Sequence, residues 1–369
     1  MPNIQENKIL ILDFGSQYTQ LIARRIREIG VYCEIVPYNV STHFIENLKP
    51  NGIILSGGPD SVYKDDSSKA PEIVFELNIP ILGICYGMQT MAIQLGGEAK
   101  SAKKAEFGFT QIRAKNHSKL LANIHDEIND EGHNLLDVWM SHGIEVTKLP
   151  EGFELIASSI NCPIAAIANT EKNLYGLQFH PEVTHTKQGF QILERFVIDI
   201  CNCKKNWTSD NIIKDLLLNI KTQVGNKKII LGLSGGVDSS VLAVLIQQAI
   251  GDQLTCVFVD NGLLRHNEAE EVMDTFSKNM GVQVVRVNAQ QYFYDKLLIE
   301  SDPELKRKII GKAFIEIFNQ EAKKMNDVKF LAQGTIYPDI IESAGASFSN
   351  AKVIKSHHNV GGLPDNIKF

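Results

Sequence analysis

Short apolar runs alternate with amphipathic stretches along most of the chain, and this alternation constrains the fold more than any other feature of the sequence. An apolar run at 8–14 precedes a helix-like stretch at 17–30 and a second apolar run at 31–38. The alternation returns in the second half, where apolar runs occupy 254–260 and 282–287. Strands and helices that alternate in this way form parallel sheets covered by helices. The sequence therefore predicts an α/β protein.

A polar stretch at 201–211 separates the two series of apolar runs. It interrupts the periodicity, and Thr208 or Ser209 within it can cap the next helix. The length of 369 residues also favours two domains, because single domains usually have roughly 100–200 residues. We predict a first domain at 1–203 and a second at 204–369, each a mostly parallel twisted sheet covered by helices.

The overall composition favours a protein that acts on small molecules. A formal net charge of -6 gives no basic surface for nucleic acid. The 6 cysteines are spread thinly, unlike those of a secreted disulfide-rich scaffold, which favours a reducing compartment. The sequence opens without a signal-type segment, and no apolar run approaches the ~20 residues that span a membrane. We therefore expect a cytoplasmic protein that binds neither nucleic acid nor membrane.

Cys85 lies in the stretch GICYG, between an apolar strand predicted at 79–84 and the helix that follows. Small residues on both sides of a nucleophile allow the tight strand-to-helix turn that exposes its side chain. The start of the helix adds partial positive charge and free N–H groups, which favour the thiolate over the thiol. A buried core cysteine is the alternative, but the flanking glycines have no evident purpose in a plain strand. We interpret Cys85 as a candidate nucleophile.

His180 and Glu182 supply the other groups that a cysteine nucleophile needs. His180 leaves the end of an apolar strand, Pro181 prevents the strand from continuing, and Glu182 follows. A base beside the nucleophile and an acid that orients the base are the usual requirements. The stretch SGGP at 56–59 offers backbone N–H groups for an oxyanion. Although His180 alone could be a structural histidine, the whole pattern favours acyl transfer through a thioester.

The motifs SGGP, GICYGMQ and FHPEV occur in this order, and residues 8–202 resemble the class I glutamine amidotransferase domain. The resemblance implies hydrolysis of glutamine to glutamate and ammonia. It also implies roles for individual residues: Cys85 attacks the side-chain amide, His180 moves the proton, Glu182 orients His180, the backbone N–H groups of Gly58 and Tyr86 hold the oxyanion, and Gln89 binds glutamine.

Ile144 departs from this family pattern. It follows Gly143 in the stretch VWMSHGIEV, where we expect aspartate. If that aspartate helps to hold the amino group of glutamine, the departure affects the affinity for glutamine and leaves the triad intact.

The stretch SGGVDSS at 234–240 lies between a predicted strand and a predicted helix, a layout typical of phosphate binding. It has glycines for close backbone approach and serine hydroxyls, but it lacks the lysine of a Walker A loop. Asp238 would repel a bare phosphate, so its presence indicates a cation, most simply Mg²⁺. A Gly–Ser turn without a ligand is the alternative. The candidate residues for ATP and pyrophosphate are Ser234, Gly235, Gly236, Val237, Asp238, Ser239 and Ser240, with Asp238 as the metal ligand.

The 234–240 loop resembles the pyrophosphate loop of the N-type ATP pyrophosphatases, which cleave ATP between the α- and β-phosphates. By this resemblance Val259, near the end of the next strand, lies close to the adenine and ribose. A triad amidotransferase joined to such a loop resembles the family of glutamine-hydrolysing GMP synthases, as do the segments at 333–343 and 355–364. In that family the second segment is a lid, in which Lys355 is the implied neutraliser of phosphate charge.

The resemblance to this family implies a reaction of purine biosynthesis and a set of partners. An oxygen of XMP is adenylated by ATP, and ammonia from the glutaminase then displaces AMP to give GMP. Mg²⁺ with ATP is the implied cofactor, and the full-length enzymes are expected to be homodimers. The family carries a further C-terminal domain that supplies much of the XMP site. Because the sequence stops at Phe369, we expect a truncated chain that is deficient in XMP binding.

Two other interpretations stay open from the sequence. The glutaminase could be fused to another adenylating module, for example one that thiolates tRNA, although the net charge disfavours binding to tRNA. A non-catalytic nucleotide-binding regulator could also retain the fold, but the candidate residues Cys85, His180, Glu182 and Asp238 are all present.

Overall fold

The computed structural model describes residues 4–62, 67–115, 118–325 and 327–334. Contacts among the residues divide the chain into two compact units, which we call unit 1 (1–212) and unit 2 (213–369). The division falls within helix α6, near the polar stretch that interrupts the sequence periodicity. Each unit is described by itself.

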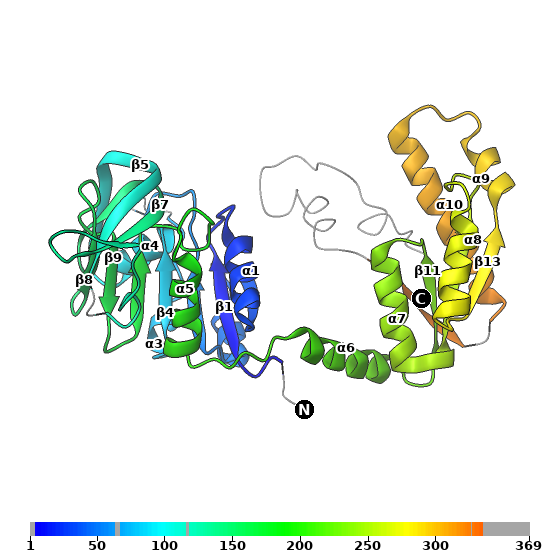
Figure 1. The fold of residues 1–369 in the computed structure, drawn as a ribbon, viewed down its shortest axis with the longest axis horizontal. Helices are drawn as coiled ribbons and strands as arrows, with labels where there is room; N and C mark the ends of the chain where they lie inside the picture. The colour runs from blue at the N-terminus through cyan, green and yellow to red at the C-terminus, as the bar shows by residue number, and fades with distance from the viewer. Residues whose placement is uncertain (1–3, 63–66, 116–117, 326, 335–369) are drawn as a thin grey trace. The chain divides into compact units, whose positions relative to one another are not determined.

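Unit 1 is built on a mixed ten-stranded sheet with the order β2-β1-β3-β4-β10-β9-β8-β5-β7-β6 (Figure 1). The strands from β2 to β10 in this order are parallel, whereas those from β10 to β6 pair antiparallel. The antiparallel part is formed largely by the region after α4. The strands are β1 (Lys8–Asp13), β2 (Tyr32–Pro37), β3 (Gly52–Leu55), β4 (Ile81–Ile84), β5 (Glu98–Ala114), β6 (Glu127–Ile128), β7 (Asn134–Lys148), β8 (Glu154–Ser158), β9 (Ala166–Asn169) and β10 (Leu174–Leu177).

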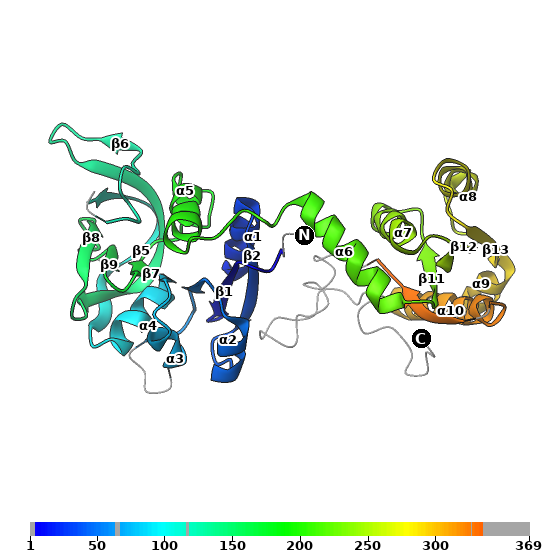
Figure 2. The ribbon, with the colours of Figure 1, turned by 90° about the horizontal axis from the view of Figure 1, so that it is seen from below.

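Helices cover both faces of the parallel part of this sheet. Ile9 and Ile11 of β1 belong to one core cluster, which also contains buried residues of α1 and α5. Leu10 and Leu12 belong to the opposite cluster, with buried residues of α2, α3 and α4. Figure 2 shows the two groups of helices on opposite sides of the sheet. The helices are α1 (Thr19–Ile29), α2 (Thr42–Leu48), α3 (Ile73–Glu76), α4 (Tyr86–Gln94) and α5 (Gly189–Glu194), which continues as a π-helical turn (Arg195–Ile200).

Unit 2 is built on a parallel four-stranded sheet with the order β13-β12-β11-β14. Buried residues of α7 and α8 pack on one face, and those of α9 and α10 pack on the other (Figure 2). The strands are β11 (Lys228–Leu233), β12 (Leu254–Asp260), β13 (Val284–Asn288) and β14 (Val328–Ala332); the helices are α6 (Ser209–Val224), α7 (Val237–Ile250), α8 (Glu268–Met273), α9 (Gln290–Leu297) and α10 (Pro303–Lys323), with a 3-10 turn at Gly251–Gln253 and a π-helical turn at Asp274–Asn279.

The predicted α/β class is confirmed in both units. The sheet of unit 2 is parallel, as predicted, and the sheet of unit 1 joins a parallel part to an antiparallel part. The antiparallel pairs are formed by β5 to β10, which follow one another in the chain between Glu98 and Leu177. Among the described residues, no helix combines the length and the apolar character that crossing a membrane requires.

Gly87 allows α4 to approach β3 closely, which makes it a test of this packing. A Cβ atom added to Gly87 would lie 2.2 Å from the carbonyl oxygen of Leu55. Because that oxygen belongs to the sheet, Gly87→Ala must displace the helix, and we expect it to lower the free energy of unfolding by roughly 2 kcal/mol or more. Urea unfolding of the two proteins measures the difference.

Gly143→Ala is the matched control in the same unit. A Cβ atom at Gly143 would have its nearest neighbour, the Cβ of Ala105, at 4.0 Å. We expect this variant to stay within about 0.5 kcal/mol of the unsubstituted protein. Equal losses in the two variants would show that the contact between α4 and β3 does not require glycine.

Candidate active site

Cys85 occupies a strained turn between β4 and α4. Its backbone has φ 52° and ψ −107°, a conformation that residues other than glycine rarely adopt. The Cys85 N–H donates to the carbonyl oxygen of Leu177 at 2.7 Å, so the turn is tied to the end of the neighbouring strand β10. The residue is 7% exposed. The turn therefore presents the thiol at the carboxyl edge of the parallel strands.

His180 and Glu182 follow β10 and form a buried pair. The His180 Nδ1 lies 2.7 Å from the Glu182 Oε1, and the two residues are 3% and 1% exposed. The backbone of His180 is also fixed, because its N–H donates to Trp139 and its carbonyl accepts from the Thr186 hydroxyl. These contacts hold the imidazole in one orientation.

The electrostatic environment favours a charged imidazole at His180. Burial by itself lowers the pKa of His180, but the favourable interactions of the imidazole with Cys85 and Glu182 outweigh this effect and raise the pKa to about 10. A protonated imidazole beside Cys85 suits a thiolate nucleophile.

Gln178 is a residue of this site for which the sequence reasoning assigned no role. Its side chain is fully buried, and its Nε2 lies 3.7 Å from the Cys85 Sγ, to which it donates. Its Oε1 accepts from the Nε2 of Gln89 at 3.1 Å. The available signal was a polar residue at the end of a buried strand, two positions before His180, because buried amides need partners.

Gln89 and Ile144 meet at the same site. The Gln89 Nε2 donates to the carbonyl oxygen of Ile144 at 2.8 Å, and Gln89 is 3% exposed. The Cys85 thiol is placed to donate to the carbonyl oxygen of Ser141 at 3.5 Å. Ile144, the residue that departs from the family pattern, therefore contributes a backbone group here, while its side chain packs against a core cluster.

Gly58 and Tyr86 lie on two sides of the Cys85 turn. A Cβ atom at Gly58 would lie 2.7 Å from the carbonyl oxygen of Phe14 and 3.3 Å from the Tyr86 ring, so a larger residue does not fit. Tyr86 is the first residue of α4, and the first N–H groups of a helix lack partners within the helix. A Cβ at Gly57 would lie 3.3 Å from the His180 Cε1, so the glycine stretch approaches the histidine. Backbone donors and candidate catalytic side chains thus converge.

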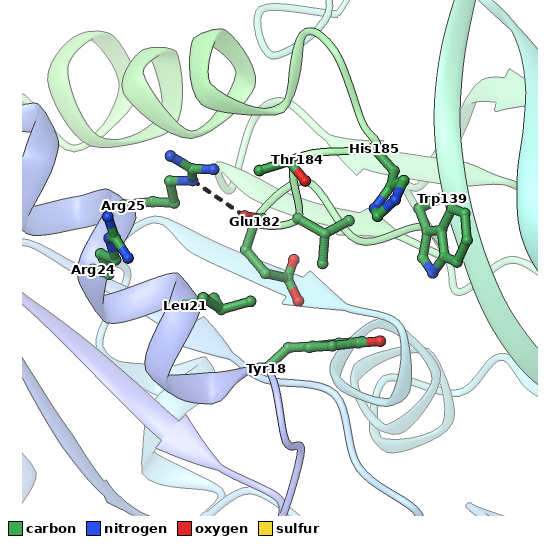
Figure 3. Close-up of a pocket in the computed structure, with 9 residues that line it drawn as sticks. Tyr18, Leu21, Arg24, Arg25, Trp139, Glu182, Thr184 and His185 are labelled. Atoms are coloured by element: carbon green, nitrogen blue, oxygen red, sulfur yellow. Dashed lines mark hydrogen bonds between the residues drawn. The ribbon is translucent and has the colours of Figure 1, made fainter. Parts of the chain in front are cut away.

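A cavity of about 390 Å³ lies beside Glu182 (Figure 3). Arg25 donates from its Nε to the carbonyl oxygen of Glu182 at 3.1 Å, and the ring of His185 lies 4.3 Å from that of Trp139. The walls of the cavity are Tyr18, Leu21, Arg24, Arg25, Trp139, Glu182, Val183, Thr184 and His185.

The 234–240 loop of unit 2 joins β11 to α7 and is shaped by its own hydroxyl groups. The Ser239 Oγ accepts from the Ser234 N–H at 3.3 Å and donates to the Gly236 carbonyl at 3.1 Å. The Ser240 hydroxyl donates to the same carbonyl at 2.6 Å. Residues 234–238 are exposed, with Asp238 in the first turn of α7. The loop therefore offers an accessible helix N-terminus, the arrangement that favours a phosphate group.

The topology of unit 2 also marks this loop. The strand order reverses between β11 and β14, and ligands of open α/β sheets bind at the carboxyl ends of the strands at such a point. A Cβ atom at Gly334, just after β14, would lie 3.2 Å from the backbone carbon of Asp238. Two strand ends thus meet at the start of α7.

Val259 lies in β12, the strand next to β11, and its side chain is buried in a core cluster. Any contact of Val259 with a nucleotide must therefore be made by its backbone. The neighbouring Asp260 is held by Arg286 at 2.8 Å and by Gln290 at 3.1 Å. Lys355 and the segment at 355–364 lie outside the described residues, as does most of the segment at 333–343.

Family models and curated relatives match both units. The model of the class-I glutamine amidotransferases matches residues 10–200, and that of NAD synthase matches residues 210–306. A glutamine-hydrolysing GMP synthase from Ruthia magnifica is 68% identical over 369 residues, which are 100% of this chain and 70% of that protein. Relatives of the same name from Vesicomyosocius okutanii and Hydrogenovibrio crunogenus are 66% and 62% identical, with the same coverage. The chain belongs to the family of glutamine-hydrolysing GMP synthases, with a glutamine amidotransferase region followed by an ATP pyrophosphatase region.

Proposed function

We propose that unit 1 hydrolyses glutamine and that unit 2 uses ATP to activate XMP for amination by the ammonia released. The observation that carries the proposal is the buried pair of His180 and Glu182, 2.7 Å apart, directly after β10, the strand whose last residue accepts a hydrogen bond from the backbone N–H of the strained Cys85. A purely structural role of His180 would not explain why a cysteine is held in a strained conformation at the start of α4. Family membership supplies the identity of the substrates.

Glutamine hydrolysis proceeds in two steps that use the same groups. The Cys85 thiolate attacks the side-chain amide carbon of glutamine, and the N–H groups of Gly58 and Tyr86 stabilise the negative oxygen. His180 gives its proton to the nitrogen, so ammonia leaves and a thioester forms. His180 then takes a proton from water, the hydroxide attacks the thioester, and glutamate leaves as the thiolate is restored. Glu182 keeps the imidazole oriented throughout.

Gln89 is the proposed binding residue for the substrate. Both hydrogens of its amide are used by Ile144 and Gln178. Its Oε1 is therefore the group that can accept a hydrogen bond from glutamine. This arrangement offsets, in part, the lack of an aspartate at position 144.

Unit 2 binds ATP through the 234–240 loop and the backbone of Val259. The loop residues hold the β,γ-pyrophosphate, an oxygen of XMP attacks the α-phosphate, and pyrophosphate leaves. Ammonia then attacks the adenylated carbon of XMP, AMP leaves, and GMP forms. Asp238 fits Mg²⁺, because its exposed carboxylate offers oxygen ligands beside the phosphate site. Mg²⁺ bound there would neutralise charge on the phosphates.

Three further parts of the proposal follow from the family and the sequence. The first domain ends at residue 203 and the second begins at 204, in the polar stretch that precedes α6. The full-length enzyme is a homodimer, and Lys355 neutralises phosphate charge as part of a lid. The enzyme works in the cytoplasm, in keeping with six free cysteines.

Cys85→Ala tests the nucleophile. We expect this variant to lose glutaminase activity by at least about a thousandfold, because it lacks the thiol that forms the thioester. Glutamate release by this chain measures the loss. Cys33→Ala is the control, since Cys33 is a buried thiol of the same unit that donates to the Ala23 carbonyl. If Cys85→Ala still hydrolysed glutamine, Cys85 would not be the nucleophile.

Glu182→Gln tests the orienting acid through the pH profile. The interactions with Cys85 and Glu182 raise the pKa of His180 to about 10, so the imidazole stays protonated well above neutral pH. Without the Glu182 carboxylate the pKa falls, and the proton is lost at lower pH. We therefore expect the alkaline limb of the kcat/KM profile for glutamine to move to lower pH and kcat to fall. An unchanged alkaline limb would contradict the role of Glu182.

Asp238→Asn tests the cation at the phosphate loop. With Mg²⁺ present, we expect calorimetry to show about tenfold weaker ATP binding; with EDTA, the affinity should stay equal or improve, because a repulsive charge is removed. Asp252→Asn is the control, since Asp252 follows the far end of α7. Equal losses with and without Mg²⁺ would indicate a direct role for Asp238 instead of a role through the metal.

A further inference from the structure

Glu106 and His142 form a buried cross-strand pair behind the glutaminase site. They are opposite each other in the register of β5 and β7. A large bulge produces this pairing: Ser101 faces Ile144 and Glu106 faces His142, so four residues of β5 lie opposite Gly143 alone. The His142 Nε2 lies 3.4 Å from the Glu106 Oε2, and the side chains are 1% and 6% exposed.

The hydrogen bonds of this pair leave room for one proton between them. The His142 Nδ1 lies 3.1 Å from the Ile144 carbonyl oxygen, which can only accept, so Nδ1 carries hydrogen. The Glu106 Oε1 accepts from Asn161 and Thr110. Within the described residues, Oε2 and Nε2 have no hydrogen-bond partner. Two unprotonated acceptors facing each other in a buried place would repel, and a single shared proton removes this repulsion.

This pair is connected to the substrate side of the site through the Ile144 carbonyl. That oxygen accepts from the His142 Nδ1 and also from the Gln89 Nε2 at 2.8 Å. The second hydrogen of Gln89 goes to Gln178, whose own Nε2 faces the Cys85 Sγ. The orientation of the Gln89 amide is thus set by a carbonyl that His142 fixes.

We propose that Glu106 and His142 share one buried proton and act as positioning residues for glutamine binding. By holding the Ile144 carbonyl, they keep the Gln89 Oε1 turned toward the substrate. This inference rests on the proposed glutaminase function and adds to it two residues for which the sequence reasoning assigned no role. It also explains how a backbone group can serve the site at a position where the side chain is isoleucine.

Cys162 is the third member of the same cluster, and its thiol is hydrogen-bonded to a backbone carbonyl. One ligand atom from each of Glu106, His142 and Cys162 lies within 4.8 Å of the others. The Cys162 thiol, however, donates to the Ile164 carbonyl at 3.4 Å, and burial raises its pKa to about 12. In this arrangement the hydrogen of the thiol is used by the Ile164 carbonyl.

Substitutions of Glu106 separate positioning from simple packing. In Glu106→Gln, the amide oxygen can accept from Asn161 and Thr110, while the amide N–H donates to the His142 Nε2 in place of the shared proton. We expect its KM for glutamine to stay within about twofold of the unsubstituted chain. In Glu106→Met no group at position 106 can donate to the His142 Nε2 or share its proton. We expect the KM for glutamine to rise about tenfold while kcat changes by less than about twofold.

His142→Gln tests the second link of the chain. This side chain can still reach Glu106 but has no donor at the position of Nδ1, so we expect the same rise in KM as in Glu106→Met. Thermal unfolding of all three variants identifies any that fail to fold. Each of these substitutions can also be combined with Cys85→Ala, which prevents turnover. Calorimetry of glutamine binding should then rank the affinities of these variants in the same order as their KM values.

The outcomes distinguish this inference from the function on which it rests. The proposed function fails if the unsubstituted chain does not hydrolyse glutamine and the Cys85→Ala variant does not bind it. If it hydrolyses glutamine and folded Glu106→Met or His142→Gln keeps its KM, the positioning role is wrong. The shared proton would be overturned if the KM for glutamine rose as much in Glu106→Gln as in Glu106→Met. It would also be overturned if the purified chain contained one metal ion per molecule and the Cys162→Ser variant did not.

Discussion

The geometry of unit 1 depends on the strained backbone at Cys85. A non-glycine residue at φ 52° is costly, and here a short hydrogen bond to β10 and a close helix–strand contact at Gly87 hold it in place. The same turn brings the thiol beside the Gln178 amide and places the N–H of Tyr86 at the start of α4. Relaxing the turn would misplace the proposed nucleophile and the proposed oxyanion donor together, because one backbone segment carries both.

Both units use the carboxyl edge of parallel strands in the same physical way. A strand ends, a short turn follows, and a helix begins with N–H groups that lack helical partners. In unit 1 we propose that these groups stabilise an oxygen that becomes negative during acyl transfer. In unit 2 we propose that the 234–240 loop offers such groups to phosphates, which are negative from the start. The different side chains, a cysteine in one turn and an aspartate in the other, fit these two kinds of charge.

Two buried pairs of polar side chains lie in unit 1. His180 is oriented by Glu182, and His142 is held against Glu106, each pair almost removed from solvent. Such groups are stable only when their hydrogen bonds are made, and this makes their orientation well defined. A chain of hydrogen bonds runs from His142 through the Ile144 carbonyl, Gln89 and Gln178 to the Cys85 thiol. It fixes the orientation of the two amide side chains beside the thiol. Pre-organisation of this kind reduces the rearrangement that substrate binding requires.

The sequence by itself determined the α/β class and the local motifs around Cys85, His180 and the 234–240 loop, because glycine positions and apolar runs act over a few residues. It did not reveal Gln178 as a neighbour of the thiol, or the pairing of Glu106 with His142. That pairing depends on the register of β5 against β7, which a bulge shifts. Register is a property of two strands that are distant in the chain, and only the tertiary structure decides it.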